Sequence, residues 1–330
     1  MTNHTLEVRN LKTHFYTSRG VVPAVDGVSF DVPRGKVTGL VGESGCGKSV
    51  TSLSVMGLVS PPGRIVEGKI LFEGTDLARK TPREMCSLRG KELSMIFQEP
   101  MTSLNPVHTV LKQVGEVLQL HTSMNARERR DAVIHMLDLV GIPEPASRCR
   151  CYPHQLSGGL RQRVMIAMAL ICEPKLLIAD EPTTALDVTI QAQILQLMLD
   201  LQRRIHTSII LITHDLGVVA EVCDYVHVMY AGKVVESAPV FELFENPLHP
   251  YTEGLLRSIP SIESRGKGQK LHTIEGSVPS LLHLPRGCSF APRCDRVLPR
   301  CFDDVPELES QGGEHGVRCW RVARAGGSAA

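Results

Sequence analysis

The first forty residues alternate apolar and polar side chains in short runs, a pattern that is typical of β-strands. Residues 6–9 and 28–32 alternate, whereas residues 36–41 form a mostly apolar run that ends at Gly42. An alternating run predicts a strand with one buried face, and a continuous apolar run predicts a strand buried on both faces. We therefore expect three strands before residue 42.

Helical periodicity follows and then alternates with further strand-like runs. It begins at residues 49–58 and dominates the more polar stretch from about residue 100 to 165, for example at residues 126–140. Strand-like runs return at 176–179 and 208–212, with a helical pattern at 189–203 between them. Strands that alternate with helices imply a mostly parallel sheet, so the predicted fold class is α/β.

The C-terminal quarter of the chain has a different character. Residues 246–330 are rich in Pro, Gly and Cys and have few long apolar runs. The whole chain has 330 residues, whereas a typical domain has roughly 100–200. A main domain followed by a loop-rich extension is the expected organisation.

Composition and charge exclude several classes of protein. Hydrophobic residues make up 42% and charged residues 22%, which is ordinary globular usage and excludes wholesale disorder. Lys and Arg number 36 against 35 Asp and Glu, so no net charge draws the chain to nucleic acid. No apolar run reaches the roughly 18 residues of a membrane span, and the N-terminus lacks a signal sequence. We expect a soluble chain that is not secreted.

A glycine-rich segment after the third predicted strand carries the clearest functional signal. Gly42-Glu43-Ser44-Gly45-Cys46-Gly47-Lys48-Ser49 matches the phosphate-binding pattern G-x-x-x-x-G-K-[ST] at every fixed position. The glycines let backbone N–H groups curl around phosphate oxygens, and the following helix directs its positive end toward them. Lys48 is expected to reach the β- and γ-phosphates, and the Ser49 hydroxyl to bind Mg²⁺. A glycine-rich turn that only caps a helix is the alternative.

A later apolar run ends in two carboxylates. Residues 176–179 are followed directly by Asp180 and Glu181. A carboxylate at the C-terminal end of a strand lies beside the phosphate loop in folds of this class. Asp180 is therefore expected to hold Mg²⁺, usually through water, and Glu181 to polarise the attacking water. By itself such a pair before Pro182 is common turn chemistry, and the phosphate loop makes it specific.

Further motifs accompany these two in a fixed order. They are Gln98, Leu156-Ser157-Gly158-Gly159-Leu160-Arg161-Gln162-Arg163, Ala185-Leu186-Asp187 and His214. Alone, Ser-Gly-Gly before a helix is a cap and a turn. Together, the motifs resemble those of the ATP-binding subunits of ABC transporters, over residues 5 to about 245.

The resemblance implies an architecture and an assembly. It implies a P-loop NTPase core with a mostly parallel sheet, an antiparallel β subdomain and a helical subdomain at about residues 100–165. The nucleotide-binding domain would be residues 1–245. In this family two such subunits face each other head to tail and sandwich two ATP molecules. The implied partners are a sister ATPase subunit, in a heterodimer or a homodimer, and two membrane permease subunits.

The resemblance also implies roles for individual residues. Ser157, Gly158 and Gly159 would contact the γ-phosphate held by the partner's phosphate loop, and Asp187 would cross the dimer interface. Gln98 would sense Mg²⁺ and the attacking water, and His214 would contact the γ-phosphate, so both join Glu181 in the catalytic set. The ATP-binding set would be Phe15, Gly42, Glu43, Ser44, Gly45, Cys46, Gly47, Lys48, Ser49 and Val50. Phe15 would stack on adenine because it lies 27 residues before Gly42, and Tyr16 is the alternative.

Within that family the chain most resembles the ATPase subunits of dipeptide and oligopeptide importers. Residues 95–106, 152–156 and 246–252 carry this resemblance. It implies an ATPase at the cytoplasmic face of the cell membrane, with an extracytoplasmic peptide-binding protein as an indirect partner and no nucleic acid. Importers of nickel or glycosides belong to the same subgroup and stay open as alternatives. A soluble ABC ATPase of DNA repair or translation is the alternative from another class.

Four cysteines in the extension, residues 246–330, suggest a metal site. Cys288, Cys294, Cys301 and Cys319 are separated by five, six and seventeen residues, and no C-x-x-C pair of the kind that zinc sites use occurs among them. Four thiolates complete the coordination of a [4Fe–4S] cluster, and the tail of some peptide-importer ATPase subunits looks like this and holds one. The resemblance therefore implies a structural iron–sulfur cluster. Zn²⁺ is one alternative, and reduced or disulfide-linked cysteines are another.

Overall fold

The computed structural model describes residues 3–98, 103–183, 187–259 and 273–322. The chain divides into two compact units. Unit 1 comprises residues 1–6, 32–36 and 79–212, and unit 2 comprises residues 7–31, 37–78 and 213–330. Each unit is therefore assembled from segments that are far apart in the sequence.

Unit 1 is built on three parallel strands, β6 (Leu93–Ile96), β7 (Leu176–Asp180) and most of β8 (Ser208–Thr213). In their register Ile96 lies opposite Ala179, and Asp180 lies opposite Ile212. Every residue of β7 and β8 is buried, as expected for parallel strands that are covered on both faces. The strands predicted at 176–179 and 208–212 are confirmed.

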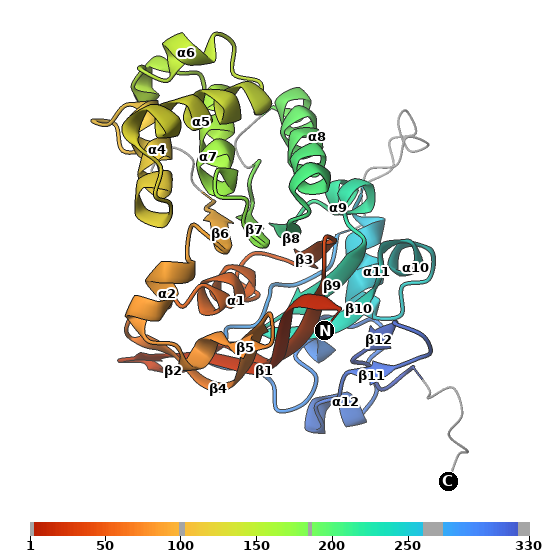
Figure 1. Ribbon diagram of the computed structural model, residues 1–330. Helices are drawn as coiled ribbons and strands as arrows, with labels where there is room; N and C mark the ends of the chain where they lie inside the picture. The colour runs from red at the N-terminus through yellow and green to blue at the C-terminus, as the bar shows by residue number, and fades with distance from the viewer. Residues whose placement is uncertain (1–2, 99–102, 184–186, 260–272, 323–330) are drawn as a thin grey trace, which may run out of the picture. The chain divides into compact units, whose positions relative to one another are not determined.

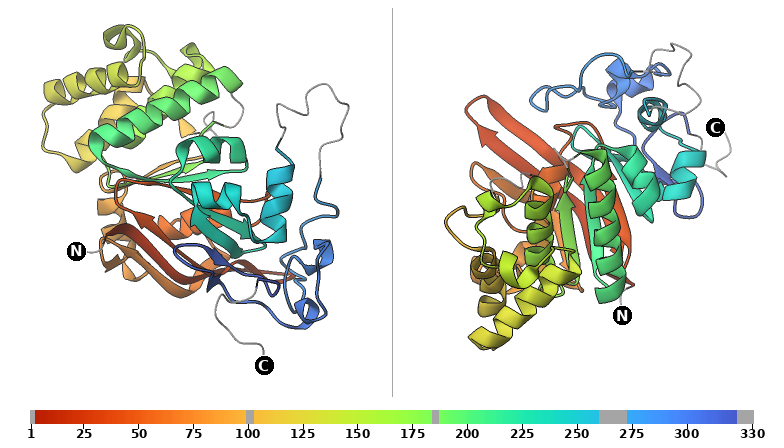
Figure 2. Two further views of the ribbon diagram at one scale, coloured as in Figure 1. Left: turned by 90° about the vertical axis from the view of Figure 1, so that its right-hand side faces the viewer. Right: turned by 90° about the horizontal axis from the view of Figure 1, so that it is seen from above.

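Helices make up most of the remainder of unit 1. They are α2 (Pro82–Leu88), α4 (Val110–His121), α5 (Ala126–Leu139), α6 (Pro145–Arg148), α7 (Gly158–Leu170) and α8 (Val188–Ile205). Figure 2 shows α4, α5 and α7 as the packed yellow and green helices, and each of them contacts the other two. A capping box of Asn125 and Glu128 starts α5. The helical patterns at 126–140 and 189–203 are confirmed by α5 and α8.

Unit 2 contains a four-stranded sheet in the order β2-β1-β4-β5. Its strands are β1 (His4–Thr17, which begins in unit 1), β2 (Gly20–Pro33, which ends in unit 1), β4 (Gly63–Phe72) and β5 (Thr75–Asp76), with β4 and β5 antiparallel. β1 and β2 are longer than the strands predicted at 6–9 and 28–32. The residues on either side of the β1–β2 turn are not buried, so the apolar alternation fades there although the strands continue.

In unit 2 a group of strands that belongs to an eight-stranded sheet carries the phosphate loop. Among them β3 (Val37–Val41) runs parallel to β9 (Tyr225–Tyr230), and β9 pairs antiparallel with β10 (Lys233–Pro239). The extension adds β12 (Gly316–Val317) to β10, and β11 (Glu309–Ser310) pairs with β12 (Figure 1). The extension is thus joined to this sheet by backbone hydrogen bonds.

Short helices complete unit 2. They are α1 (Lys48–Val55), α9 (Leu216–Val222), α10 (Val240–Glu245), α11 (Pro250–Arg257) and α12 (Arg300–Asp303). α1 begins at Lys48, inside the phosphate-loop motif and close to the helix predicted at 49–58. None of the helices among the described residues has the length and apolarity that a membrane span requires.

Candidate nucleotide site

The phosphate loop joins β3 to α1, and its three glycines have a backbone conformation that other residues rarely adopt. Gly42, Gly45 and Gly47 have φ angles of 148°, 80° and 103°. A Cβ atom at Gly42 would collide with the carbonyl oxygen of Met229 in β9, and one at Gly47 with the carbonyl oxygen of Ala24 in β2. The loop therefore needs glycine at these two positions both for conformation and for space.

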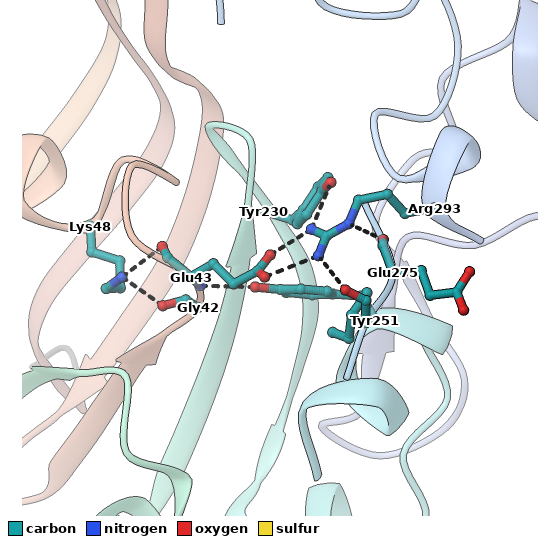
Figure 3. Close-up of polar contacts among 8 residues, drawn as sticks. Gly42, Glu43, Lys48, Tyr230, Tyr251, Glu275 and Arg293 are labelled. Carbon is teal, nitrogen blue, oxygen red and sulfur yellow. Dashed lines mark hydrogen bonds and ion pairs between the residues drawn. The ribbon is translucent and has the colours of Figure 1, made fainter. Parts of the chain in front are cut away.

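Lys48 lies within this loop, as the sequence pattern predicts. Its side chain is 6% exposed, and Nζ donates hydrogen bonds to the carbonyl oxygens of Gly42 (2.7 Å) and Glu43 (3.0 Å) (Figure 3). Burial raises the pKa of the Cys46 thiol, so this side chain stays neutral. The loop thus holds one buried ammonium group, which is the charge that a triphosphate needs.

The two candidates for the adenine-stacking aromatic lie in different surroundings at the end of β1. A Cβ atom at Gly63 would lie 2.6 Å from a ring carbon of Phe15, so Phe15 packs closely against β4. Tyr16 is 40% exposed, and the Arg64 guanidinium carbon lies 4.3 Å from its ring centroid. The choice between Phe15 and Tyr16 stays a prediction.

In unit 1 the carboxylates lie at the C-terminal end of β7. Asp180 is the last residue of the strand and is 4% exposed. Glu181 follows in the left-handed region, with a φ angle of 46°, and its N–H donates to the carbonyl of Ile212 (2.9 Å). Such a backbone is uncommon outside glycine and is concentrated at functional sites.

Gln98 contacts Glu181 directly. Gln98 follows β6 and is exposed, and its Nε2 donates a hydrogen bond to Glu181 Oε2 (3.2 Å). The sequence predicted both residues as catalytic but gave no indication that they touch. The bond links the ends of β6 and β7, and it directs the amide at one oxygen of the carboxylate.

The signature segment forms the start of α7. Ser157 is the N-cap residue, and its side chain accepts a hydrogen bond from the N–H of Leu160 (3.4 Å). Ser157 and Gly158 are exposed, and a Cβ atom built at Gly158 meets nothing within 4 Å. An exposed helix N-terminus offers N–H donors and a positive dipole to an anion.

Gln162, one turn further along α7, is a residue whose role the sequence did not indicate. It is fully buried, and its Nε2 donates a hydrogen bond to the carbonyl oxygen of Pro182. The helix that begins with the signature is thereby tied to the turn that follows Glu181. The signal available in the sequence was a glutamine placed among apolar residues at helical spacing.

Two other predicted residues occupy exposed positions. Asp187 is the N-cap of α8 and accepts a hydrogen bond from the N–H of Ile190 (3.0 Å), so it has a local structural role. Ala185 and Leu186, which precede it in its motif, lie outside the described residues. His214 follows β8, belongs to unit 2 and is exposed.

The four cysteines of the extension line one small cavity in unit 2, together with His249 and Trp320. The N–H of Cys288 donates to the carbonyl of Cys301 (2.8 Å). Burial raises the pKa of the Cys288 thiol to about 11. Among the described residues, no three His, Cys, Asp or Glu side chains are grouped so as to hold a metal ion, so the predicted four-cysteine metal site stays a proposal.

Comparison with known proteins identifies the family. One family model, described as ABC transporter, matches residues 25–184, and another, described as Oligopeptide/dipeptide transporter, C-terminal region, matches residues 235–301. The oligopeptide transport ATP-binding protein AppD of Bacillus subtilis is 56% identical over 316 residues, which are 96% of this chain and 96% of AppD. This chain belongs to the ABC transporter family.

Other members of the ABC transporter family are also similar. The dipeptide transport ATP-binding protein DppD of Bacillus subtilis is 53% identical over 96% of this chain and 94% of DppD. The dimeric structure of MJ0796, a bacterial ABC transporter cassette, matches 71% of this chain and 98% of its own, with a TM-score of 0.64 and 26% identity. The structure of cbiO1 from Clostridium perfringens matches 74% of this chain and 92% of the cbiO1 chain, with a TM-score of 0.63 and 29% identity. The predicted α/β P-loop fold is confirmed.

Proposed function

We propose that this chain is the ATP-hydrolysing subunit of an ABC importer for dipeptides or oligopeptides, working at the cytoplasmic face of the cell membrane. The observation that carries this function is the match of almost the whole chain to oligopeptide and dipeptide transport ATP-binding proteins. The phosphate loop from Gly42 to Ser49 and the Gln98–Glu181 pair are both intact. ATP-dependent uptake of a labelled peptide is the measurement that tests it.

The ATP-binding residues act through charge and shape. The glycines of the loop leave room for phosphate oxygens, and the Lys48 ammonium neutralises part of the triphosphate charge. Mg²⁺ prefers oxygen ligands, and the Ser49 hydroxyl, the Gln98 amide and the Asp180 carboxylate supply that type of donor. When bound, Mg²⁺ neutralises charge on the β- and γ-phosphates.

In ATP hydrolysis Glu181 acts as the general base. Its carboxylate accepts a proton from water as the water oxygen attacks the γ-phosphorus and the bond to ADP breaks. Gln98 donates to Oε2 of this carboxylate (3.2 Å), which fixes the direction of the side chain. His214, which follows β8, would contact the γ-phosphate and orient the water.

A second ATPase subunit would complete each site. The exposed N-terminus of α7, at Ser157, Gly158 and Gly159, suits the γ-phosphate of an ATP held by the partner's loop. Asp187, exposed at the start of α8, would lie at the same interface. The sister subunit is either a second copy of this chain or a related ATPase, and two permeases and a peptide-binding protein complete the transporter.

The four cysteines would hold a structural [4Fe–4S] cluster. Cys288, Cys294, Cys301 and Cys319 surround one cavity, and four thiolates are the ligand set of such a cluster. The extension has few regular elements, so a cluster would crosslink loops that have little apolar core of their own.

Metal analysis tests this cluster. We expect protein purified without oxygen to be brown and to contain about four irons per chain. Cys288→Ser should lower the iron content, because it removes a ligand, whereas Cys86→Ser, an exposed cysteine of α2, should not. Colourless protein with about one zinc per chain would refute the cluster but keep the four-thiol site. Protein with neither metal would refute both.

A further inference from the structure

The second residue of the phosphate loop is held by the C-terminal extension. The backbone N–H of Glu43 donates a hydrogen bond to Tyr251 Oη (2.8 Å). The Glu43 carboxylate accepts two more from Arg293, from Nη1 to Oε2 (2.7 Å) and from Nη2 to Oε1 (3.1 Å) (Figure 3). A two-point pair of this kind fixes the orientation of both groups as well as their separation.

Arg293 is part of the interior rather than a surface charge. Its side chain is only 4% exposed. Nε donates to the carbonyl of Glu275 (3.0 Å), Nη2 to that of Ile274 (3.3 Å) and Nη1 to Tyr230 Oη (3.3 Å). A buried guanidinium needs such a complete set of acceptors, and loss of one partner from a buried pair is far more costly than loss of an exposed pair.

Tyr251 is fixed by its aromatic neighbours. It lies in the first turn of α11, and its side chain is fully buried. Its ring centroid lies 4.7 Å from that of Tyr230 and 5.4 Å from that of Phe290. The Tyr251 hydroxyl, which accepts the hydrogen bond from the Glu43 N–H, therefore has little freedom to move.

The backbone at Glu43 also contacts Lys48 of the phosphate loop. Lys48 Nζ donates to the carbonyl oxygen of Glu43 (3.0 Å) and to that of Gly42 (2.7 Å). Glu43 thus contacts the extension through its N–H and carboxylate, and Lys48, the residue expected to bind the phosphates, through its carbonyl oxygen.

We propose that Arg293 and Tyr251 are positioning residues of the ATP site, through which the extension fixes Glu43 and sets the affinity of the phosphate loop for ATP. This inference rests on the proposed function, because it takes ATP as the ligand of the loop. We call the hydrogen bonds that Arg293 and Tyr251 make with Glu43 the clamp. Without the clamp the loop samples other conformations, and the apparent affinity for ATP is multiplied by the fraction of time that the loop spends in the binding conformation. The extension is then both joined to the sheet through β12 and part of the structure that positions the ATP site.

The experiment measures the Kd for ATP with Mg²⁺ on the full-length subunit. Arg293→Met keeps an aliphatic side chain and removes the guanidinium. We expect it to raise Kd about tenfold, as for a loop that is competent a tenth of the time. The kcat of the assembled transporter at saturating ATP should change less than Kd does, since no catalytic group is altered. Tyr251→Phe should raise Kd by a smaller factor.

Two controls isolate the clamp. Arg296→Met removes a similar pair inside the extension, in which Arg296 donates to both oxygens of Glu253 (2.7 Å and 2.6 Å), and it should leave Kd unchanged. An equal loss of affinity in Arg296→Met would mean that any damage to the extension has this effect, and it would overturn the proposal.

The double variant Arg293→Met/Glu43→Gln is the second control, because it also removes the Glu43 carboxylate charge that Arg293→Met leaves unpaired. If it regains the wild-type Kd, the single variant acts by repelling ATP and the positioning role is wrong. Failure of the wild-type chain to bind ATP at all would instead refute the proposed function.

Discussion

Glu181→Gln should stop ATP turnover in the assembled transporter while leaving ATP binding intact. The amide has nearly the same shape as the carboxylate but cannot accept the proton of the attacking water. General bases contribute about 10²–10⁴-fold to rate, so the loss should be at least two orders of magnitude. The phosphate loop is not altered, so the Kd for ATP should stay within a small factor of the wild-type value.

The matched control for this variant is another Glu→Gln change that removes one negative charge. Glu221 is exposed on α9, and Glu221→Gln should keep normal turnover. Steady-state phosphate release and equilibrium ATP titration measure the two quantities separately. Near-normal turnover in Glu181→Gln would remove Glu181 from the role of general base.

Ser157→Arg should block hydrolysis of ATP that is bound by the partner subunit, although the mutated subunit still binds ATP itself. Ser157 is exposed at the start of α7, so an arginine side chain at this position can extend away from the protein. In a closed dimer its bulk and charge would occupy the place of the γ-phosphate. Hydrolysis should therefore fall by two orders of magnitude or more at the facing site, on the scale of loss of an essential transition-state contact.

Ser157→Ala separates this effect from helix capping. It removes the side-chain acceptor of the Leu160 N–H and should cost about 1 kcal/mol of stability, as N-cap substitutions do. Thermal unfolding of both variants measures that cost. If isolated Ser157→Arg fails to bind ATP although it is folded, Ser157 acts in its own site and the head-to-tail arrangement is wrong.

The sequence predicted those elements of the fold and of the site that depend on residues close together in the chain. Residues 36–41, 176–179 and 208–212 are apolar runs in strands that are buried on both faces, and they are β3, β7 and β8 in the structure. The phosphate loop was predictable because its glycines and Lys48 lie within eight consecutive residues. Ser157 was predictable as a helix cap for the same reason.

Contacts between distant segments could not be predicted in this way. Glu43 and Arg293 are 250 residues apart, and no pattern in either segment indicates the other. The Gln162–Pro182 bond and the Gln98–Glu181 bond likewise depend on tertiary packing. β4 was missed because its residues are mostly not fully buried, which leaves no regular alternation. The sequence marked the four cysteines as a group, but only the fold shows that they share a cavity.

Peptide uptake into membrane vesicles tests the central claim most directly. The vesicles would carry the assembled transporter with this chain as an ATPase subunit, supplied with the binding protein, a labelled dipeptide or oligopeptide, and ATP with Mg²⁺. We expect the label to accumulate with the wild-type chain, and to remain at background without ATP or with Glu181→Gln. Uptake of nickel or a glycoside in place of peptide, under the same conditions, would contradict the peptide assignment. Peptide uptake that continues with Glu181→Gln in every ATPase position would contradict the claim that this chain powers transport.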